Sequence, residues 1–256
     1  MRKRNLKPLI KLLIIGAIIS LGVFFITAGL RKAFTHSDYF KVLEVITSAG
    51  VPKNFTYLKG ENIFSLDLRK ESRYILQQNS LYRDVTLVKL LPNRIFIYFI
   101  PRESIALVKL YRTFSIDRDG FLFEAHPGQL ADAGIPVITG LETKIFGPKS
   151  GSSYKTIKEV ILALNAIKAF KGSRVLRYYK IRKIDVANIS DASIFIELPH
   201  SENAWLQIKM NETGLKDKAG LLANLLLTLK NDLPKVKYID LRFKEPLIKM
   251  KDKNAL

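Results

Sequence analysis

The sequence contains no cysteine. This absence excludes disulfide frameworks, thiolate zinc sites and cysteine nucleophiles, and thiol usage therefore gives no information on the redox compartment. The three histidines, His36, His126 and His200, have no spacing that would place two metal ligands on one helical face. No G-x-S-x-G nucleophile elbow and no Gly-Lys-Ser/Thr phosphate loop occurs. The sequence therefore predicts a binding protein that is not an enzyme and uses no metal or cofactor.

Acidic residues are missing from the first 37 positions, and charges of either sign are missing from Leu12 to Leu30. These 19 residues would span about 28 Å as a helix, which matches the hydrocarbon core of a bilayer. Basic residues precede this apolar run at five positions: Arg2, Lys3, Arg4, Lys7 and Lys11. Only Arg31 and Lys32 follow it directly. This asymmetry predicts a cytoplasmic tail at 1–11, a single transmembrane helix at 12–30 and a C-terminal part outside the cytoplasm.

The 256 residues carry 42 Lys and Arg against 23 Asp and Glu, a net charge of +19, and 48% of the residues are hydrophobic. Seven of the bases flank the apolar run, which leaves 35 bases and 23 acids in the exported part. DNA is a poor partner for an exported domain, whereas anionic headgroups and acidic proteins are available to it. We therefore expect protein and membrane partners, no nucleic acid and no small-molecule substrate.

A small first domain is expected at 38–103. The pattern predicts a strand at Phe40–Ile46, a helix at Leu68–Gln78 capped by Asp67, and strands at Asp84–Leu90 and Arg94–Ile100. Between the last two strands, Leu91-Pro92-Asn93 is typical of a turn. This order predicts a small sheet with helices on one face.

A larger second domain is expected at 104–250, followed by a tail at 251–256. Two long helices are predicted at Tyr154–Phe170 and Leu215–Asn231 from their apolar spacing. The remaining elements are strands, at Ile105–Tyr111, Thr113–Asp117, Phe121–Glu124, Ile181–Ala187, Ser193–Leu198, Ala204–Met210 and Val236–Phe243. Asp119-Gly120 supplies the turn of a tight hairpin. The fold class is therefore α+β, and this order favours an antiparallel sheet.

Five short motifs in order resemble the bacterial division protein family FtsQ, called DivIB in Gram-positive organisms. The first two are similar to the opening of the family's POTRA domain and its closing hairpin: Phe40-Lys41-Val42 with Gly60-Glu61-Asn62-Ile63-Phe64-Ser65-Leu66-Asp67, and Val85-Thr86-Leu87-Val88-Lys89 with Leu91-Pro92-Asn93-Arg94-Ile95. The others are similar to signatures of its β domain: Ile116-Asp117-Arg118-Asp119-Gly120-Phe121-Leu122-Phe123, Ile135-Pro136-Val137-Ile138-Thr139-Gly140 and Tyr238-Ile239-Asp240-Leu241-Arg242-Phe243. The resemblance covers nearly the whole chain.

The resemblance implies a POTRA domain of order strand-helix-helix-strand-strand, followed by a β domain. Two departures stand out: Ser104 replaces an expected proline, and Lys53 to Leu58 leave little room for the first POTRA helix. The implied function is a non-catalytic scaffold at the division septum that recruits FtsB- and FtsL-type partners. FtsK-, FtsW- and FtsI-type proteins are further implied partners.

The implied partner-binding site is the C-terminal edge strand of the β domain, which would add a partner strand to the sheet. By position, Leu241, Arg242 and Phe243 fall on that strand, and Lys244, Glu245 and Pro246 lie just beyond it. Phe243 is the expected anchor, Arg242 is expected to pair with an acidic partner, and Pro246 is expected to end the ladder. Leu87 and Lys89 fall on the implied recruitment surface of the POTRA domain. Core positions for Leu241, Phe243 and Leu87 are the alternative.

Other functions also fit a basic, singly anchored chain. A membrane-tethered POTRA chaperone or receptor would hold peptides during envelope protein export or assembly. An anchored enzyme of the cell envelope is a third possibility, although the sequence offers no pocket for it.

Overall fold

The computed structural model describes residues 7–48, 55–125, 128, 134–199 and 204–251. The predicted tails at 1–11 and 251–256 therefore lie largely outside the described residues, as do His126 and His200. The chain divides into two compact units. Unit 1 comprises Met1–Gln78 and Tyr82–Ile100, and unit 2 comprises Asn79–Leu81 and Pro101–Leu256.

Unit 1 begins with one long apolar helix, α1 (Lys7–His36). Within it, Ile15–His36 is long and apolar enough to cross a membrane: its 22 residues correspond to about 33 Å. None of its described side chains is buried by the protein; Phe24 and Phe25, for example, are 63% and 65% exposed. This confirms an N-terminal helix suited to a single membrane span, ending six residues beyond the predicted one.

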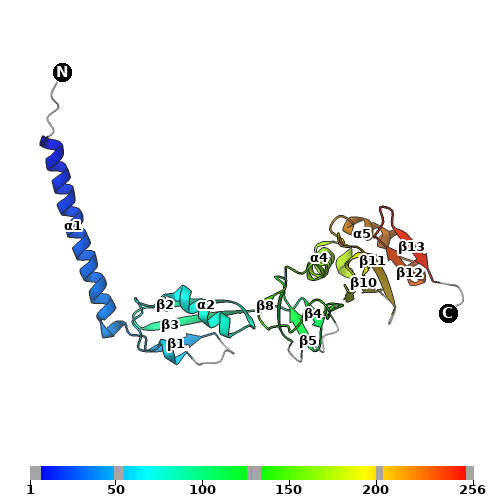
Figure 1. Cartoon of the computed structure of the whole chain (residues 1–256), viewed down its shortest axis with the longest axis horizontal. Coiled ribbons are helices and arrows are strands. Elements are labelled where there is room, and N and C mark those ends of the chain that lie inside the picture. The colour runs from blue at the N-terminus through cyan, green and yellow to red at the C-terminus, as the bar shows by residue number, and fades with distance from the viewer. Residues whose placement is uncertain (1–6, 49–54, 126–127, 129–133, 200–203, 252–256) are drawn as a thin grey trace, which may run out of the picture. The chain divides into compact units, whose positions relative to one another are not determined.

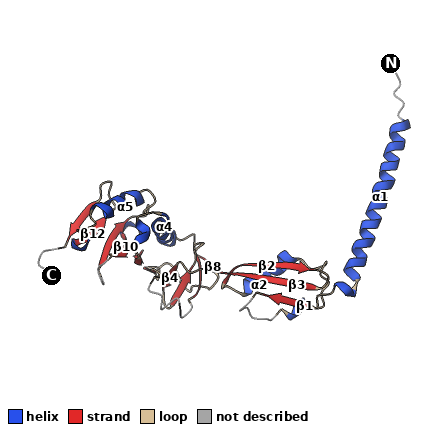
Figure 2. Ribbon diagram, turned by 180° about the vertical axis from the view of Figure 1, so that it is seen from behind, coloured by secondary structure: helices blue, strands red, loops and turns tan. Residues whose placement is uncertain are grey.

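The rest of unit 1 is a three-stranded sheet with a helix on one face. Its elements are η1 (Asp38–Phe40), β1 (Glu44–Thr47), η2 (Thr56–Leu58), α2 (Leu68–Gln78), β2 (Tyr82–Leu90) and β3 (Arg94–Pro101). The strand order is β1-β3-β2, and β1 runs parallel to the central β3. Helix α2 lies in front of the strands in Figure 1 and behind them in Figure 2, so it covers one face only.

Local sequence explains why α2 and its sheet form as predicted. The Asp67 carboxylate accepts hydrogen bonds from the backbone N–H groups of Arg69 and Lys70, at 3.0 and 3.2 Å, and so caps the helix start. Along β3, alternate side chains enter the core of the unit: Ile95, Ile97 and Phe99. The two helices expected between the first strands are represented, among the described residues, by the short 3-10 helix η2 and by α2.

Unit 2 is built on a ten-stranded sheet, as far as the structure describes it. Its strands are β4 (Ala106–Lys109), β5 (Thr113–Ile116), β6 (Phe121–Glu124), β7 (Val137–Thr139), β8 (Ser152–Ser153), β9 (Ile181–Asp185), β10 (Ala192–Glu197), β11 (Trp205–Met210), β12 (Val236–Asp240) and β13 (Leu247–Met250). Its helices are α4 (Lys158–Gly172) and α5 (Ala219–Thr228), with short 3-10 helices at η3 (Leu176–Tyr178), η4 (Ile189–Asp191) and η5 (Leu233–Lys235). The strand order is β13-β12-β11-β10-β9-β7-β4-β5-β6-β8.

The sheet is mixed, so the prediction of an antiparallel sheet is wrong for three of its strand pairs. Strands β4 and β7, β7 and β9, and β11 and β12 pair in parallel. For the last two of these pairs the reason is a helix in the connection: α4 lies between β7 and β9, and α5 lies between β11 and β12. A helix in the connection carries the chain back along the sheet, so that the next strand starts at the same end as the previous one. Both helices bury apolar side chains in the shared core.

A buried ion pair fixes the start of unit 2. Arg102 Nη1 lies 2.6 Å from Asp117 Oδ2, and the two side chains are 7% and 4% exposed. The other carboxylate oxygen of Asp117 accepts the N–H groups of Asp119 and Phe121, at 2.9 and 3.0 Å. Arg102 also donates through Nε to the carbonyl of Ser80, at 3.1 Å. One carboxylate therefore closes the β5–β6 turn and holds the arginine that binds the 79–81 segment.

We predict that Asp117→Ala lowers the free energy of unfolding of unit 2 by about 3–5 kcal/mol, because Arg102 is left buried without its counter-charge. The measurement is urea unfolding of the full chain in detergent, followed by the fluorescence of Trp205, the only tryptophan, which lies in β11. The matched control is Arg118→Ala in the same turn, where the side chain is 66% exposed, and its expected cost is below about 0.5 kcal/mol. Equal midpoints for the two variants would contradict the role given to the pair.

Candidate interaction surfaces

The C-terminal edge of the unit 2 sheet is a strand that sequence reasoning missed. Strand β13 pairs antiparallel with β12 and has no described neighbour on its other side (Figure 1). All four of its residues are exposed, including the apolar Leu247, Ile248 and Met250, which are 54%, 39% and 42% exposed. An open edge with apolar side chains is a template for another strand.

The direction of the backbone groups of β13 follows from one hydrogen bond. The N–H of Lys251 donates to the carbonyl of Lys235, at 2.8 Å, and so points toward β12. Because backbone groups alternate in direction along a strand, the N–H of Lys249 also points toward β12. The N–H groups of Ile248 and Met250 then point away from the sheet, where a partner strand would accept them.

The last predicted strand was expected to end at Phe243, but in the structure it ends three residues earlier, at Asp240. The predicted boundary is therefore wrong. Strand β12 ends at Asp240, whose Oδ1 accepts the backbone N–H of Arg242 at 3.0 Å and turns the chain. Lys218 Nζ binds the carbonyls of Leu241 and Phe243 and holds the turn. Pro246 does not end the ladder, because β13 starts immediately after it. Proline is compatible with a position just before a strand, where its missing N–H costs no ladder bond.

The six residues of the predicted binding site are therefore in a turn beside the edge strand. Leu241 is 1% exposed and belongs to the core, whereas Phe243 is 52% exposed, so the two do not share a face. Lys244 and Glu245 are exposed, and Pro246 is half-buried. The exposed ring of Phe243 and strand β13 together form the C-terminal edge surface, which we define as Phe243 and Leu247–Met250.

Arg242 is already paired within the chain. Its guanidinium binds both oxygens of Asp240, with Nη2 at 2.7 Å from Oδ2 and Nε at 3.0 Å from Oδ1. Its Nη1 lies 3.0 Å from Asp191 Oδ1. These bonds, above all the hydrogen bonds from Arg242, hold the pKa of the Asp240 carboxyl below its usual value of 3.8. Arg242 thus stabilises the turn, and its charge is largely compensated before any partner arrives.

In unit 1 the two residues of the predicted recruitment surface, Leu87 and Lys89, lie on the face of β2 that is turned toward the core. Leu87 is 7% exposed and packs in the core under α2, whereas Lys89 is half-buried. The side chains between and beside them point outward: Val88 and Leu90 are 43% and 39% exposed. Tyr98 and Ile100 of β3, at 50% and 37%, are also exposed. The alternation in the sequence was the available signal, but it did not reveal which face α2 covers.

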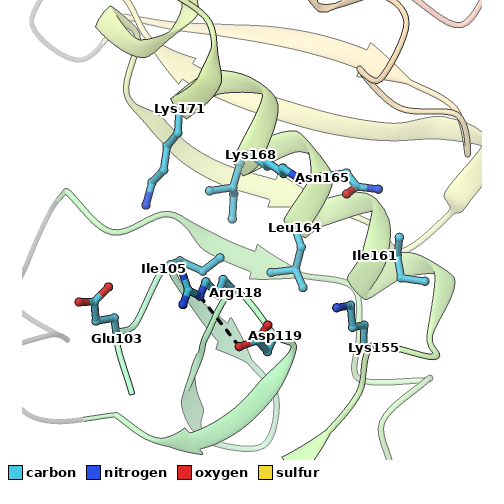
Figure 3. A pocket seen from close by; sticks show the side chains of 11 residues that line it. Glu103, Ile105, Arg118, Asp119, Lys155, Ile161, Leu164, Asn165, Lys168 and Lys171 are labelled. Carbon is cyan, nitrogen blue, oxygen red and sulfur yellow. Dashed lines mark ion pairs between the residues drawn. The ribbon is translucent and has the colours of Figure 1, made fainter. Parts of the chain in front are cut away.

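A groove of about 650 Å³ lies in unit 2 between α4 and the segment around the β5–β6 turn (Figure 3). Figure 3 shows Leu164, Lys168 and Lys171 on α4 facing the part of the chain that carries Arg118 and Asp119. Arg118 Nε and Asp119 Oδ2 are 4.0 Å apart. The groove is lined by Glu103, Ile105, Arg118, Asp119, Lys155, Ile161, Leu164, Asn165, Ile167, Lys168 and Lys171. Its apolar floor and its excess of bases over carboxylates suit an anionic, partly apolar segment.

The described residues contain no group of three His, Cys, Asp or Glu side chains arranged to hold a metal ion. A scan against protein-family models finds no match for the chain, and no curated protein matches its sequence. The surfaces themselves are thus the basis for a functional proposal.

We predict that Asp240 makes unit 2 sensitive to acid. Because its pKa is lowered in the folded chain, its ionised form contributes stability above the ordinary pKa of 3.8, and this contribution is lost as the pH falls through the lowered value. Asp240→Asn removes this titration. Urea midpoints from Trp205 fluorescence at pH 7 and pH 3 should therefore fall less between the two pH values in the variant than in the parent chain. An identical fall in both would contradict this contribution.

Proposed function

We propose that this chain is a non-catalytic scaffold of the bacterial division machinery, of the FtsQ/DivIB type, which recruits FtsB- and FtsL-type partners at the septum. The observation that carries the proposal is the uncovered strand β13, with three exposed apolar side chains and two outward N–H groups. A soluble domain gains nothing from such an edge and risks aggregation through it. A partner strand would cover the exposed apolar side chains and accept the outward N–H groups, and would so remove the risk of aggregation.

Strand addition explains how four residues serve as a specific site. Main-chain hydrogen bonds to the outward N–H and C=O groups give affinity, and alternate side chains set the register. Phe243 lies at the start of the edge, where its 52% exposed ring can bury area against the partner. Lys244, Lys249 and Lys251 surround the strand with positive charge, so a partner segment that carries carboxylates is favoured.

The architecture of unit 1 also supports the proposal. Its order of strand, short helix, helix, strand and strand, with α2 on one face, fits a POTRA-type domain. This sheet and its helix α2 follow directly on the segment Ile15–His36, which is long enough to span a membrane. The basic residues before that segment favour a cytoplasmic N-terminus. In the proposed topology, unit 2 and the part of unit 1 that follows α1 lie outside the cytoplasm, where a single-pass septal scaffold would act.

The alternative, a membrane-tethered POTRA chaperone or receptor, is favoured by one observation. A groove of about 380 Å³ runs between α2 and the edge strand β2, lined by Leu68, Arg69, Ser72, Arg73, Asp84, Val85, Thr86 and Leu87. Such a groove beside a strand edge suits an extended peptide. A chaperone of this kind would bind many unrelated peptides through unit 1, whereas the scaffold binds one partner set through β13.

We predict that Ile248→Pro abolishes capture of the FtsB/FtsL-type partners of the same cell, whereas Ile248→Ala weakens it by less than about tenfold. Proline removes an outward N–H and places a ring where the partner strand would lie, while alanine retains the backbone donor. Capture is measured with purified full-length chain and co-purified partners at equal concentrations. Unchanged Trp205 fluorescence in both variants is the control for folding. Equal capture by the two variants would show that the backbone of β13 is not the interface.

We predict that cells depleted of this protein fail to divide and grow as filaments, and that a fluorescent fusion gathers at midcell. The Ile248→Pro fusion should still reach the membrane through α1 but should not rescue division. Rescue is scored by cell length after depletion. Normal division of depleted cells, together with an even envelope distribution of the fusion, would exclude a division scaffold and leave the chaperone alternative.

A further inference from the structure

The end of α1 is fastened to the sheet-containing part of unit 1 by the side chain of Asn62. Its Nδ2 donates to the carbonyl of Phe34, at 2.9 Å, and to that of Ser37, at 3.3 Å. Its Oδ1 accepts the backbone N–H of Phe64, at 2.9 Å. The last carbonyls of a helix have no partner within the helix, so a side chain from elsewhere in the fold stabilises the helix end. Asn62 therefore links the candidate membrane span to the first folded domain.

Three phenylalanines reinforce this junction. The ring centroids of Phe34 and Phe40 are 5.4 Å apart, those of Phe34 and Phe64 are 5.6 Å apart, and those of Phe40 and Phe64 are 5.0 Å apart. Such a cluster adds stabilisation beyond the area that it buries. Phe34 belongs to the last turns of α1, whereas Phe64 belongs to the part of unit 1 that follows α1. The cluster therefore joins the same two parts as Asn62.

Apolar side chains around this junction are left uncovered. Tyr39 and Leu43 are 66% and 67% exposed, and Phe64 is 40% exposed. Leu91, in the turn between β2 and β3, is 61% exposed. The N–H of Leu43 donates to the carbonyl of Asn93, at 2.9 Å, so the turn that carries Leu91 lies beside Leu43. Residues distant in sequence thus gather at one end of the domain, which is the end that meets α1.

The charges near this end suit a lipid headgroup region. Asp38 and Glu44, two of the nearby carboxylates, are paired: Lys41 Nζ lies 2.8 Å from Asp38, and Arg94 Nε lies 3.1 Å from Glu44. Arg31 and Lys32, near the end of α1, are exposed. Paired acids and exposed bases allow approach to an anionic surface, and tyrosine is enriched at membrane–water interfaces.

We propose that Tyr39, Leu43, Phe64 and Leu91 form a juxtamembrane surface that inserts into the interface of the bilayer crossed by α1. The candidate span ends at His36, and Tyr39 follows it directly in the 3-10 helix η1 (Asp38–Phe40), so this end of the domain adjoins the end of the span. The partner is the lipid surface itself. The inference rests on α1 crossing a membrane and is independent of the division partners proposed for β13.

The test uses tryptophan as a depth probe in full-length chain reconstituted into vesicles of phosphatidylglycerol and phosphatidylethanolamine, with and without brominated acyl chains. Trp205→Phe provides a background without other tryptophans. Leu91→Trp is the decisive probe, because it is far from α1 in sequence and reaches the bilayer only if the domain rests on it. Tyr39→Trp reports the helix exit. Tyr74→Trp, on α2 and 51% exposed, is the matched control.

We expect brominated lipid to quench Leu91→Trp and Tyr39→Trp at least twofold more than Tyr74→Trp. Quenching of Leu91→Trp at the level of Tyr74→Trp overturns the proposal, since only the helix exit would then touch lipid. Absence of quenching at Tyr39→Trp also overturns it, since Tyr39 is one of the residues proposed to insert. A division defect or its absence has no bearing on these readings, so this proposal and the proposed function fail separately.

A second variant tests the fastening. Asn62→Ala removes the donor to Phe34 and Ser37, so the domain should swing more freely about the helix end. We expect it to reduce the quenching of Leu91→Trp by about half while leaving that of Tyr39→Trp unchanged. Circular dichroism confirms that unit 1 stays folded. Unchanged quenching of Leu91→Trp in the Asn62→Ala chain would contradict the role assigned to Asn62.

Discussion

The buried pair of Arg102 and Asp117 is the interaction on which unit 2 depends. A carboxylate that is 4% exposed needs both a counter-charge and hydrogen-bond donors, and Asp117 receives them from Arg102 and from the backbone of the turn that follows it. That turn places Gly120, whose carbonyl accepts the N–H of Tyr154 at 2.8 Å. Gly120 has φ +76°, and an added Cβ would lie 3.2 Å from Lys155. One ion pair thereby connects the entry of the chain, the β5–β6 hairpin and the segment that leads into α4.

Short-range signals in the sequence were sufficient for much of the fold. The bounds of α2 were predicted correctly because Asp67 caps a strongly amphipathic segment, and the turn at 91–93 was found because proline and asparagine mark it. The apolar run at the N-terminus also predicted its helix, although α1 continues beyond Leu30 to His36. Parallel pairing in unit 2 could not be predicted in this way. It depends on which strands become neighbours after α4 and α5, a long-range outcome that no local pattern encodes.

The candidate site shows the same limit at the scale of single residues. Leu241 and Phe243 are two positions apart, so a continuous strand would place both on one face. The hydrogen bond from the Arg242 N–H to Asp240 ends the strand first, and the two side chains part, one into the core and one into solvent. No strand was predicted in the run after Pro246, which lies in the second domain before the tail at 251–256. The lysines that alternate with its apolar residues are nevertheless compatible with an edge strand, which the structure shows as β13.

The two exposed apolar surfaces suit different kinds of partner because of what adjoins each of them. Among the described residues, β13 has no neighbouring strand on its outer side, and the backbone groups on that side would be satisfied by another polypeptide strand but not by the acyl chains of a lipid. In the juxtamembrane surface, the side chains of Leu43 and Leu91 are exposed, whereas the backbone N–H groups of Tyr39, Leu43 and Phe64 are already bound within the chain. Exposed apolar side chains whose N–H groups are bound suit the bilayer interface, and this surface lies beside the helix that would enter the membrane. The proposed anchoring and the proposed recruitment therefore use different residues and need not compete.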